Sequence, residues 1–135
     1  MRILVLCTGN SCRSQMVEGL LKSMHPSWEI FSAGTIPTGF VHPMAIMSLR
    51  EIGIDISNYE SKSINLFLDQ SWDWVITVCG DANENCPMFN GTVKNRIHLG
   101  FPDPALSDGS DRQKLKVFNT LRDKMIHVLE NTFAS

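Results

Sequence analysis

The sequence predicts an α/β fold built on a parallel sheet, in one domain that spans residues 1–135. Short apolar segments of β-type composition alternate along the chain with segments in which apolar residues recur at helical spacing. The short segments are apolar at most positions, which is typical of strands buried on both faces. No repeat, linker or low-complexity segment interrupts this alternation. We therefore expect a sheet covered by helices, with any ligand at the carboxyl ends of its strands.

The expected elements follow one another from the N-terminus. Strands are predicted at 2–7 (RILVLC), 28–33 (WEIFSA), 73–79 (DWVITVC) and 96–101 (RIHLGF). The first helix is expected after Ser11, because Met16, Leu20 and Met24 lie on one helical stripe. Further helices are predicted at 43–52, at 63–70 and from 110 to about 131.

Size, charge and cysteine usage restrict the classes of function. Of the 135 residues, 43% are hydrophobic, which is enough for the core of one domain. With 12 Lys and Arg against 14 Asp and Glu, the net charge of −2 offers no basic surface for nucleic acid. The apolar start ILVL is too short for a signal peptide, and no run is long enough to span a membrane. We expect a cytoplasmic monomer whose four cysteines are reduced.

The loop CTGNSCRS, residues 7–14, joins the first strand to the first helix and has the composition of an oxyanion site. Such a loop directs backbone N–H groups and the positive end of the helix dipole toward a bound anion. Gly9 allows a tight bend, and Asn10 tolerates a left-handed conformation. Arg13 adds a planar cation that binds two oxygens at once. The expected anion-binding residues are Thr8, Gly9, Asn10, Ser11, Cys12, Arg13 and Ser14.

Cys7 lies at the base of this loop and is the candidate nucleophile. The N–H groups and Arg13 favour its thiolate, and such surroundings lower a cysteine pKa to roughly 3.5–7.5. The alternative is a buried, inert cysteine beside a capping loop. Cys12 is interpreted as a buried loop thiol, although oxidation can pair it with Cys7.

Asp103 lies in the segment FPDPA, directly after the fourth predicted strand. The prolines on either side hold it in an extended, non-helical segment. If the fourth strand belongs to the same sheet, this carboxyl group lies at the same edge as Cys7 and can protonate a departing oxygen. An ordinary turn aspartate is the alternative.

Cys79 and Cys86 lie in VCGDANENCP, after the third predicted strand. Their spacing and the lack of nearby histidines argue against zinc, so we predict no metal. If the third strand adjoins the first, Cys79 and Cys7 end about 4.8 Å apart at one edge. On a helix, Cys86 would be roughly 10 Å from Cys79, so a bond between them requires the turn to unwind.

The residues between these two cysteines suit such unwinding. Gly80, Asp81, Asn83 and Asn85 are weak helix formers, and Pro87 ends the element. The alternative is that Cys79 and Cys86 are two unrelated free thiols.

The segments CTGNSCRSQM, FSAGT, GIDIS, VCGDANENCP and FPDPA follow the order found in one known family. The chain resembles the thioredoxin-coupled arsenate reductases, which share the low-molecular-weight protein tyrosine phosphatase fold. The resemblance implies a four-stranded parallel sheet of order 2-1-3-4 with helices on both faces. It implies Cys7 as attacking thiolate, Asp103 as general acid, and Arg13 and Ser14 as loop residues. It further implies that Cys79 and Cys86 form a redox pair coupled to thioredoxin, without a cofactor.

Two other functions compete with arsenate reduction. The first is a phosphatase on the same fold, but family phosphatases usually have a tyrosine after the Asp-Pro pair, where this chain has Ala105. Its only tyrosine is Tyr59. The second is a non-catalytic thiol sensor or anion-binding module, which has no need of Asp103 beside the loop.

The resemblance also raises the question of a bound cation. Some related reductases hold potassium at positions that match Asn10, Glu18 and Ser32 together with an aspartate, and the aspartate position aligns with Lys62 here. We expect the Lys62 ammonium to take the place of the cation and to pair with Glu18. We therefore expect potassium to have little specific effect.

Overall fold

A computed structural model describes residues 1–86 and 88–133. The strands are β1 (Arg2–Cys7), β2 (Glu29–Gly34), β3 (Trp72–Thr77) and β4 (Val93–His98). The α-helices are α1 (Arg13–Met24), α2 (Pro43–Arg50), α3 (Gly80–Glu84) and α4 (Asp111–Thr132). Two short 3₁₀ turns cover Ile64–Leu66 and Pro104–Leu106.

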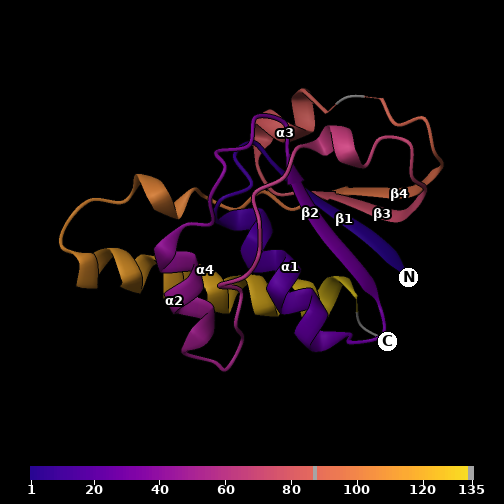
Figure 1. The fold of residues 1–135 in the computed structure, drawn as a ribbon. Helices are drawn as coiled ribbons and strands as arrows, with labels where there is room; N and C mark the ends of the chain where they lie inside the picture. The colour runs from indigo at the N-terminus through magenta and orange to yellow at the C-terminus, as the bar shows by residue number, and fades with distance from the viewer. Residues whose placement is uncertain (87, 134–135) are drawn as a thin grey trace.

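The four strands form one parallel sheet of order β2-β1-β3-β4, which confirms the predicted fold class and strand order. The central strand β1 is fully buried from Ile3 to Leu6, because helices cover both faces of the sheet. Helices α1, α2 and α4 pack against one another on one side. Helix α3 and the 3₁₀ turn Ile64–Leu66 lie on the other side (Figure 1). No helix among residues 1–86 and 88–133 is long and apolar enough to cross a membrane.

The register of the sheet brings the predicted site residues to one edge. Cys7 pairs with Gly34 of β2, and the preceding Leu6 pairs with Thr77 of β3. The Val78 N–H donates to the Leu6 carbonyl at 2.9 Å, so the chain continues beside β1 for one more residue before it reaches Cys79. The carboxyl ends of β1 and β3 therefore place Cys7 and Cys79 next to each other, as the order of the strands requires.

The fourth strand differs from the prediction. β4 covers Val93–His98 rather than 96–101, and most of its residues are exposed. An edge strand that pairs on one side only needs no continuous apolar run, so its first three residues gave no hydrophobic signal. Beyond β4 the chain stays extended, since the Leu99 and Phe101 N–H groups donate to Thr77 and Val78 carbonyls. This extension carries Asp103 across to the 7–14 loop.

The predicted helix at 63–70 is also wrong, because the structure has only a 3₁₀ turn at Ile64–Leu66. Ile64 and Phe67 are buried while Leu66 is 65% exposed. Two buried residues at a spacing of three are satisfied by one i, i+3 turn, as the Phe67 N–H to Ile64 carbonyl bond of 2.9 Å shows. The predicted helix at 43–52 ends earlier, at Arg50. Pro87, predicted to end the element after Cys79, lies outside the described residues.

Candidate active site

Four carbonyl groups of the 7–14 loop point away from its interior. Those of Cys7, Thr8, Gly9 and Ser11 accept hydrogen bonds from the N–H groups of residues 35, 36, 38 and 42 at 2.8–3.2 Å. Across a trans peptide, each N–H points opposite to the preceding C=O. The outward carbonyls therefore turn the N–H groups of the loop inward. At Gly34 a Cβ would lie 2.5 Å from the Thr8 carbonyl oxygen, so this close approach of β2 to the loop requires glycine.

Helix α1 begins at the end of this loop without a side-chain cap. By contrast, His42 caps α2 and Ser110 caps α4. The first N–H groups of a helix have no partner within the helix, and the positive end of its dipole lies there. The start of α1 thus adds donors and positive potential to those of the loop.

Asn10 fixes the shape of the loop from the inside. Its φ of 48° is left-handed, as predicted, and its side chain is fully buried. The amide nitrogen donates to the hydroxyls of Ser14 at 2.8 Å and Ser32 at 2.9 Å. The amide oxygen accepts from Gln15 Nε2 at 3.0 Å and from the Lys62 N–H at 2.8 Å. With both donors and both acceptor sites paired, the amide holds the loop rigidly.

Behind Asn10, a carboxylate and an ammonium group continue this network. Ser32 Oγ donates to Glu18 Oε1 at 2.5 Å, and Lys22 Nζ donates to Glu18 Oε2 at 2.7 Å. The expected pairing of Lys62 with Glu18 is wrong: Lys62 Nζ donates to the Glu60 carbonyl instead. Lys22 lies one helical turn after Glu18, and this i, i+4 spacing was the sequence signal for the true pair. Burial lowers the pKa of Lys62, although the Glu18 charge opposes this effect.

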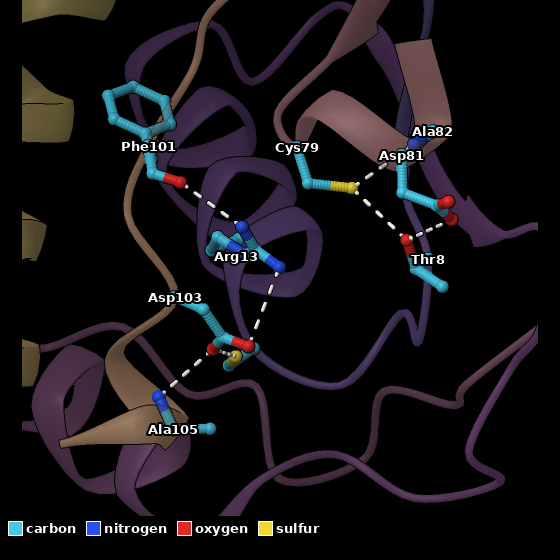
Figure 2. A network of polar contacts seen from close by, with 9 residues as sticks. Thr8, Arg13, Cys79, Asp81, Ala82, Phe101, Asp103 and Ala105 are labelled. Carbon is cyan, nitrogen blue, oxygen red and sulfur yellow. Dashed lines mark hydrogen bonds and ion pairs between the residues drawn. The ribbon is translucent and has the colours of Figure 1, made fainter. Parts of the chain in front are cut away.

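Arg13 and Asp103 face each other across the mouth of the loop (Figure 2). Arg13 Nη1 donates to the Phe101 carbonyl at 3.1 Å, and Nη2 forms an ion pair with Asp103 Oδ2 at 3.6 Å. Arg13 Nε is buried and has no hydrogen-bond partner. A buried guanidinium with an unpaired donor is suited to receive an oxyanion. Asp103 Oδ1 accepts from the Ala105 N–H at 3.0 Å and from the Cys12 thiol at 3.7 Å.

Cys12 is buried, as expected, and remains a thiol. Burial and then the Asp103 charge raise its pKa to about 12. A protonated thiol can donate to a carboxylate, which is the contact that Cys12 makes with Asp103.

Cys7 and Cys79 follow adjacent strands and act on each other electrostatically, and their pKa values are displaced in opposite directions. Burial raises the pKa of Cys7 more than the Arg13 charge lowers it. Burial acts on Cys79 too, but a hydrogen bond with Thr8 Oγ1 and one from the Ala82 N–H outweigh it and lower the pKa of Cys79. Figure 2 shows the Cys79 sulfur between these two partners.

The prediction that the loop lowers the pKa of Cys7 is therefore wrong for the structure as described. Arg13 shares its charge with Asp103, and Cys7 is only 3% exposed, so burial dominates. The Asp81 carboxylate accepts a hydrogen bond from Thr8 Oγ1 at 2.9 Å, so it orients the hydroxyl that lies beside Cys79. Sequence reasoning missed this contact of Asp81, because it depends on how α3 packs against β1.

Cys86 is the third cysteine of the predicted redox relay. It lies beyond the end of α3, partly buried, with its sulfur 3.8 Å from Arg96 Nη1 of β4. All four cysteines are thiols in this structure. Within residues 1–86 and 88–133, no group of three or more His, Cys, Asp or Glu side chains is placed to hold a metal ion.

A cavity of about 500 Å³ lies beside Asp103, on the side that faces α4. Pro102, Pro104 and α4 residues from Gln113 to Lys124 line it, whereas Cys7 and the rest of the 7–14 loop do not. We therefore assign the chemistry to the loop and its thiols rather than to this mostly apolar cavity.

Comparison with known proteins agrees with this geometry. The family model for low molecular weight phosphotyrosine protein phosphatase matches residues 2–132. The chain belongs to this family.

Within the family, the relatives most similar to this chain include arsenate reductases. The arsenate reductase of Oceanobacillus iheyensis is 46% identical over 124 residues, which are 91% of this chain and 88% of that protein. The arsenate reductase of Staphylococcus aureus is 42% identical over 130 residues, 96% of this chain and 93% of that protein. A solved structure of an arsenate reductase in the phosphate binding state superposes with a TM-score of 0.80 at 34% identity, and covers 98% of this chain and 96% of that chain.

Proposed function

We propose that this enzyme reduces arsenate to arsenite by passing a disulfide from Cys7 through Cys79 to Cys86, and that thioredoxin regenerates it. The observation that carries the proposal is that β1 and β3 end side by side, which places Cys79 next to Cys7 at the base of an oxyanion-binding loop. Hydrolysis of a phosphoester needs only one nucleophilic cysteine. A second thiol with a lowered pKa, held against the first, is suited to disulfide chemistry.

In the first step, arsenate binds to the inward N–H groups of the loop and to Arg13. The oxyanion competes with Asp103 for the guanidinium, since Arg13 Nε is unpaired and the ion pair with Asp103 is long at 3.6 Å. The bound anion thus replaces Asp103 as the partner of the Arg13 guanidinium. Cys7 then attacks arsenic through its sulfur. Asp103, displaced from Arg13 by the bound anion, takes up a proton from solvent and passes it to the oxygen that leaves as water. The Cys7 proton passes to solvent.

In the second step, Cys79 attacks the Cys7 sulfur of the thiol–arsenate adduct. A Cys7–Cys79 bond forms, the sulfur–arsenic bond breaks, and its electron pair remains on arsenic, which leaves as arsenite. The Cys79 proton passes to solvent or to the departing oxyanion. Thr8 Oγ1 and the Ala82 N–H hold Cys79 for this attack at 3.3 and 3.4 Å.

In the third step, Cys86 attacks Cys79, which frees Cys7 and moves the disulfide outward. Thioredoxin, a small dithiol protein, then reduces the Cys79–Cys86 bond. This cycle requires a compartment that keeps thiols reduced, in agreement with action in the cytoplasm. No bound cofactor is needed, because every electron moves through sulfur.

The same loop and general acid support a phosphatase as the second candidate function. Phosphate and arsenate are both tetrahedral oxyanions, and the family to which the chain belongs includes phosphatases by its name. Ala105 supplies only a backbone N–H to Asp103, and no aromatic side chain stands at that position to line an aryl pocket. A phosphorylated Cys7 offers no route for reduction, so Cys79 and Cys86 would have no use.

A coupled assay tests the proposal. With thioredoxin, thioredoxin reductase and NADPH supplied, we expect NADPH consumption that depends on arsenate and on all three cysteines. Hydrolysis of para-nitrophenyl phosphate serves as the comparison. Rapid hydrolysis without any arsenate-dependent NADPH consumption would favour the phosphatase.

A further inference from the structure

Arg96 of β4 contacts Cys86 from outside the segment that carries the cysteine. Its Nη1 donates to Cys86 Sγ at 3.8 Å. The backbone of Arg96 is held by pairing with Val75 of β3, and its guanidinium lies over the ring of the buried Phe89, 5.6 Å from the centroid. The sheet and Phe89 thus fix one positive charge beside the third thiol of the relay.

The segment from Cys79 to Cys86 also contacts the rest of the protein near its N-terminal end. Thr8 Oγ1 donates to Asp81 Oδ2, and Asn85 Nδ2 donates back to Asp81 Oδ1 at 2.8 Å. These contacts hold α3 through Asp81. Arg96 also lines a cavity of about 160 Å³ with Asn83, so its side chain has room to follow Cys86 when α3 unwinds.

We propose that Arg96 is a positioning residue for Cys86, which holds the sulfur for attack on Cys79 and stabilises its negative charge during that attack. This inference rests on the proposed disulfide relay. In the step concerned, Cys86 loses its proton to solvent, and a Cys79–Cys86 bond forms as the Cys7–Cys79 bond breaks. The electron pair of the broken bond remains on Cys7 as a thiolate, so the protein undergoes no net oxidation or reduction.

A guanidinium is suited to this position because it remains charged and binds a sulfur anion more strongly than a neutral thiol. Loss of one hydrogen bond to a charged group slows a step by roughly 10-fold. The contact here is a single N–H to sulfur bond, not a two-pronged one. A lysine at this position therefore retains much of the effect.

The test follows one turnover without thioredoxin. Protein is mixed with one equivalent of arsenate, quenched with acid at successive times, alkylated and mapped by mass spectrometry. For Arg96→Met we expect arsenite release and Cys7–Cys79 formation within about 2-fold of wild type, but conversion to Cys79–Cys86 roughly 10-fold slower. Arg96→Lys should restore most of the rate of conversion.

Lys94→Met is the matched control. Lys94 lies on the same exposed strand and pairs with Asp73 at 3.1 Å, so this variant removes one positive charge from β4 without touching Cys86. It should convert the disulfide at the wild-type rate. Circular dichroism checks that each variant is folded.

The outcomes separate this inference from the relay itself. If the wild type never forms a Cys7–Cys79 bond, the proposed function fails and the role of Arg96 fails with it. If the bond forms and Arg96→Met converts it as fast as wild type or faster, only the role of Arg96 is overturned. Equal slowing in Arg96→Met and Lys94→Met, or no recovery in Arg96→Lys, would likewise overturn it.

Discussion

The 7–14 loop and the 79–86 segment lie side by side at the edge of the sheet but are built in opposite ways. The loop is largely buried, and Asn10 alone makes four side-chain hydrogen bonds inside it. The 79–86 segment contains a five-residue helix in which Gly80, Asp81 and Asn83 are weak helix formers, and most of its residues from Gly80 onward are exposed. One region is therefore rigid, and the other is easily unfolded.

This difference matches the demands of the proposed chemistry. Binding of an oxyanion requires donors that are already in place, because reorganisation during the reaction costs free energy. Transfer of a disulfide requires the opposite, since Cys86 must approach Cys79 to within the about 7 Å that a disulfide allows between Cα atoms. The four predictions below test the contrast, from the largest expected effect to the smallest.

Replacement of the nucleophile gives the largest effect. We expect Cys7→Ser to lower both arsenate reduction and any phosphatase activity by about 10³-fold or more, because both begin with attack by this sulfur. Cys86→Ser provides the contrast, since it should complete one turnover and stop with Cys7 bonded to Cys79. Arsenite released per enzyme measures both. Substantial reduction by Cys7→Ser would contradict the site assignment.

Two asparagines, one in each region, compare rigidity directly. Asn10→Ala removes four buried hydrogen bonds and leaves alanine with a φ of 48°, so the free energy of unfolding should fall by about 3 kcal/mol. Asn85→Ala removes the exposed contacts with Asp81, which should cost only about 0.5 kcal/mol. Urea denaturation measures both.

Asn10→Gly serves as the control for backbone strain, because glycine accepts a positive φ without penalty. It should be intermediate in stability between Asn10→Ala and the wild type. An equal fall in the free energy of unfolding for Asn10→Ala and Asn85→Ala would contradict the difference between the two regions.

The raised pKa of Cys12 predicts a loss of stability at alkaline pH. Its pKa is about 12 in the folded protein against an ordinary 9.0, so the stabilising effect is complete below pH 9 and is lost as the pH rises toward 12. Between pH 9 and 10, the free energy of unfolding should fall by about 1 kcal/mol on this account. Urea denaturation of reduced wild type and Cys12→Ser isolates this contribution, and parallel pH profiles would contradict it.

Potassium should have the smallest effect. Both oxygens of Glu18 already accept hydrogen bonds, from Ser32 and Lys22. The Lys62 ammonium is also close enough to interact with the Glu18 charge. At matched ionic strength, melting temperatures in potassium and sodium chloride should differ by less than about 1 °C. Clear stabilisation by potassium alone would show that the cation displaces an ammonium group.

The sheet was largely predictable because β1, β2 and β3 are mostly apolar runs, and the side-by-side ends of β1 and β3 placed Cys7 beside Cys79. The loop was predictable because glycine, asparagine and arginine at this spacing after a strand are typical of an oxyanion-binding loop. β4 was misplaced because an exposed edge strand such as VKNRIH has no hydrophobic pattern. Its position depends on pairing with β3, which local sequence does not encode.

The electrostatics of the site could not be predicted from composition. The ordering of the Cys7 and Cys79 pKa values depends on burial, on the turn of Arg13 toward Asp103, and on the Thr8 hydroxyl. These are long-range contacts, separated in sequence by up to 90 residues (13 to 103). Arg96 was missed for the same reason, because its contact with Cys86 exists only once β4 is in place.

The account is tested most directly by disulfide mapping of the wild type after one equivalent of arsenate, with amide exchange measured on the same sample. We predict a Cys79–Cys86 bond, a free Cys7 thiol, and faster exchange across residues 80–86 than in the reduced protein, while the 7–14 loop keeps its protection. A Cys7–Cys12 bond in the active protein, with Cys79 and Cys86 still free thiols, would contradict the relay.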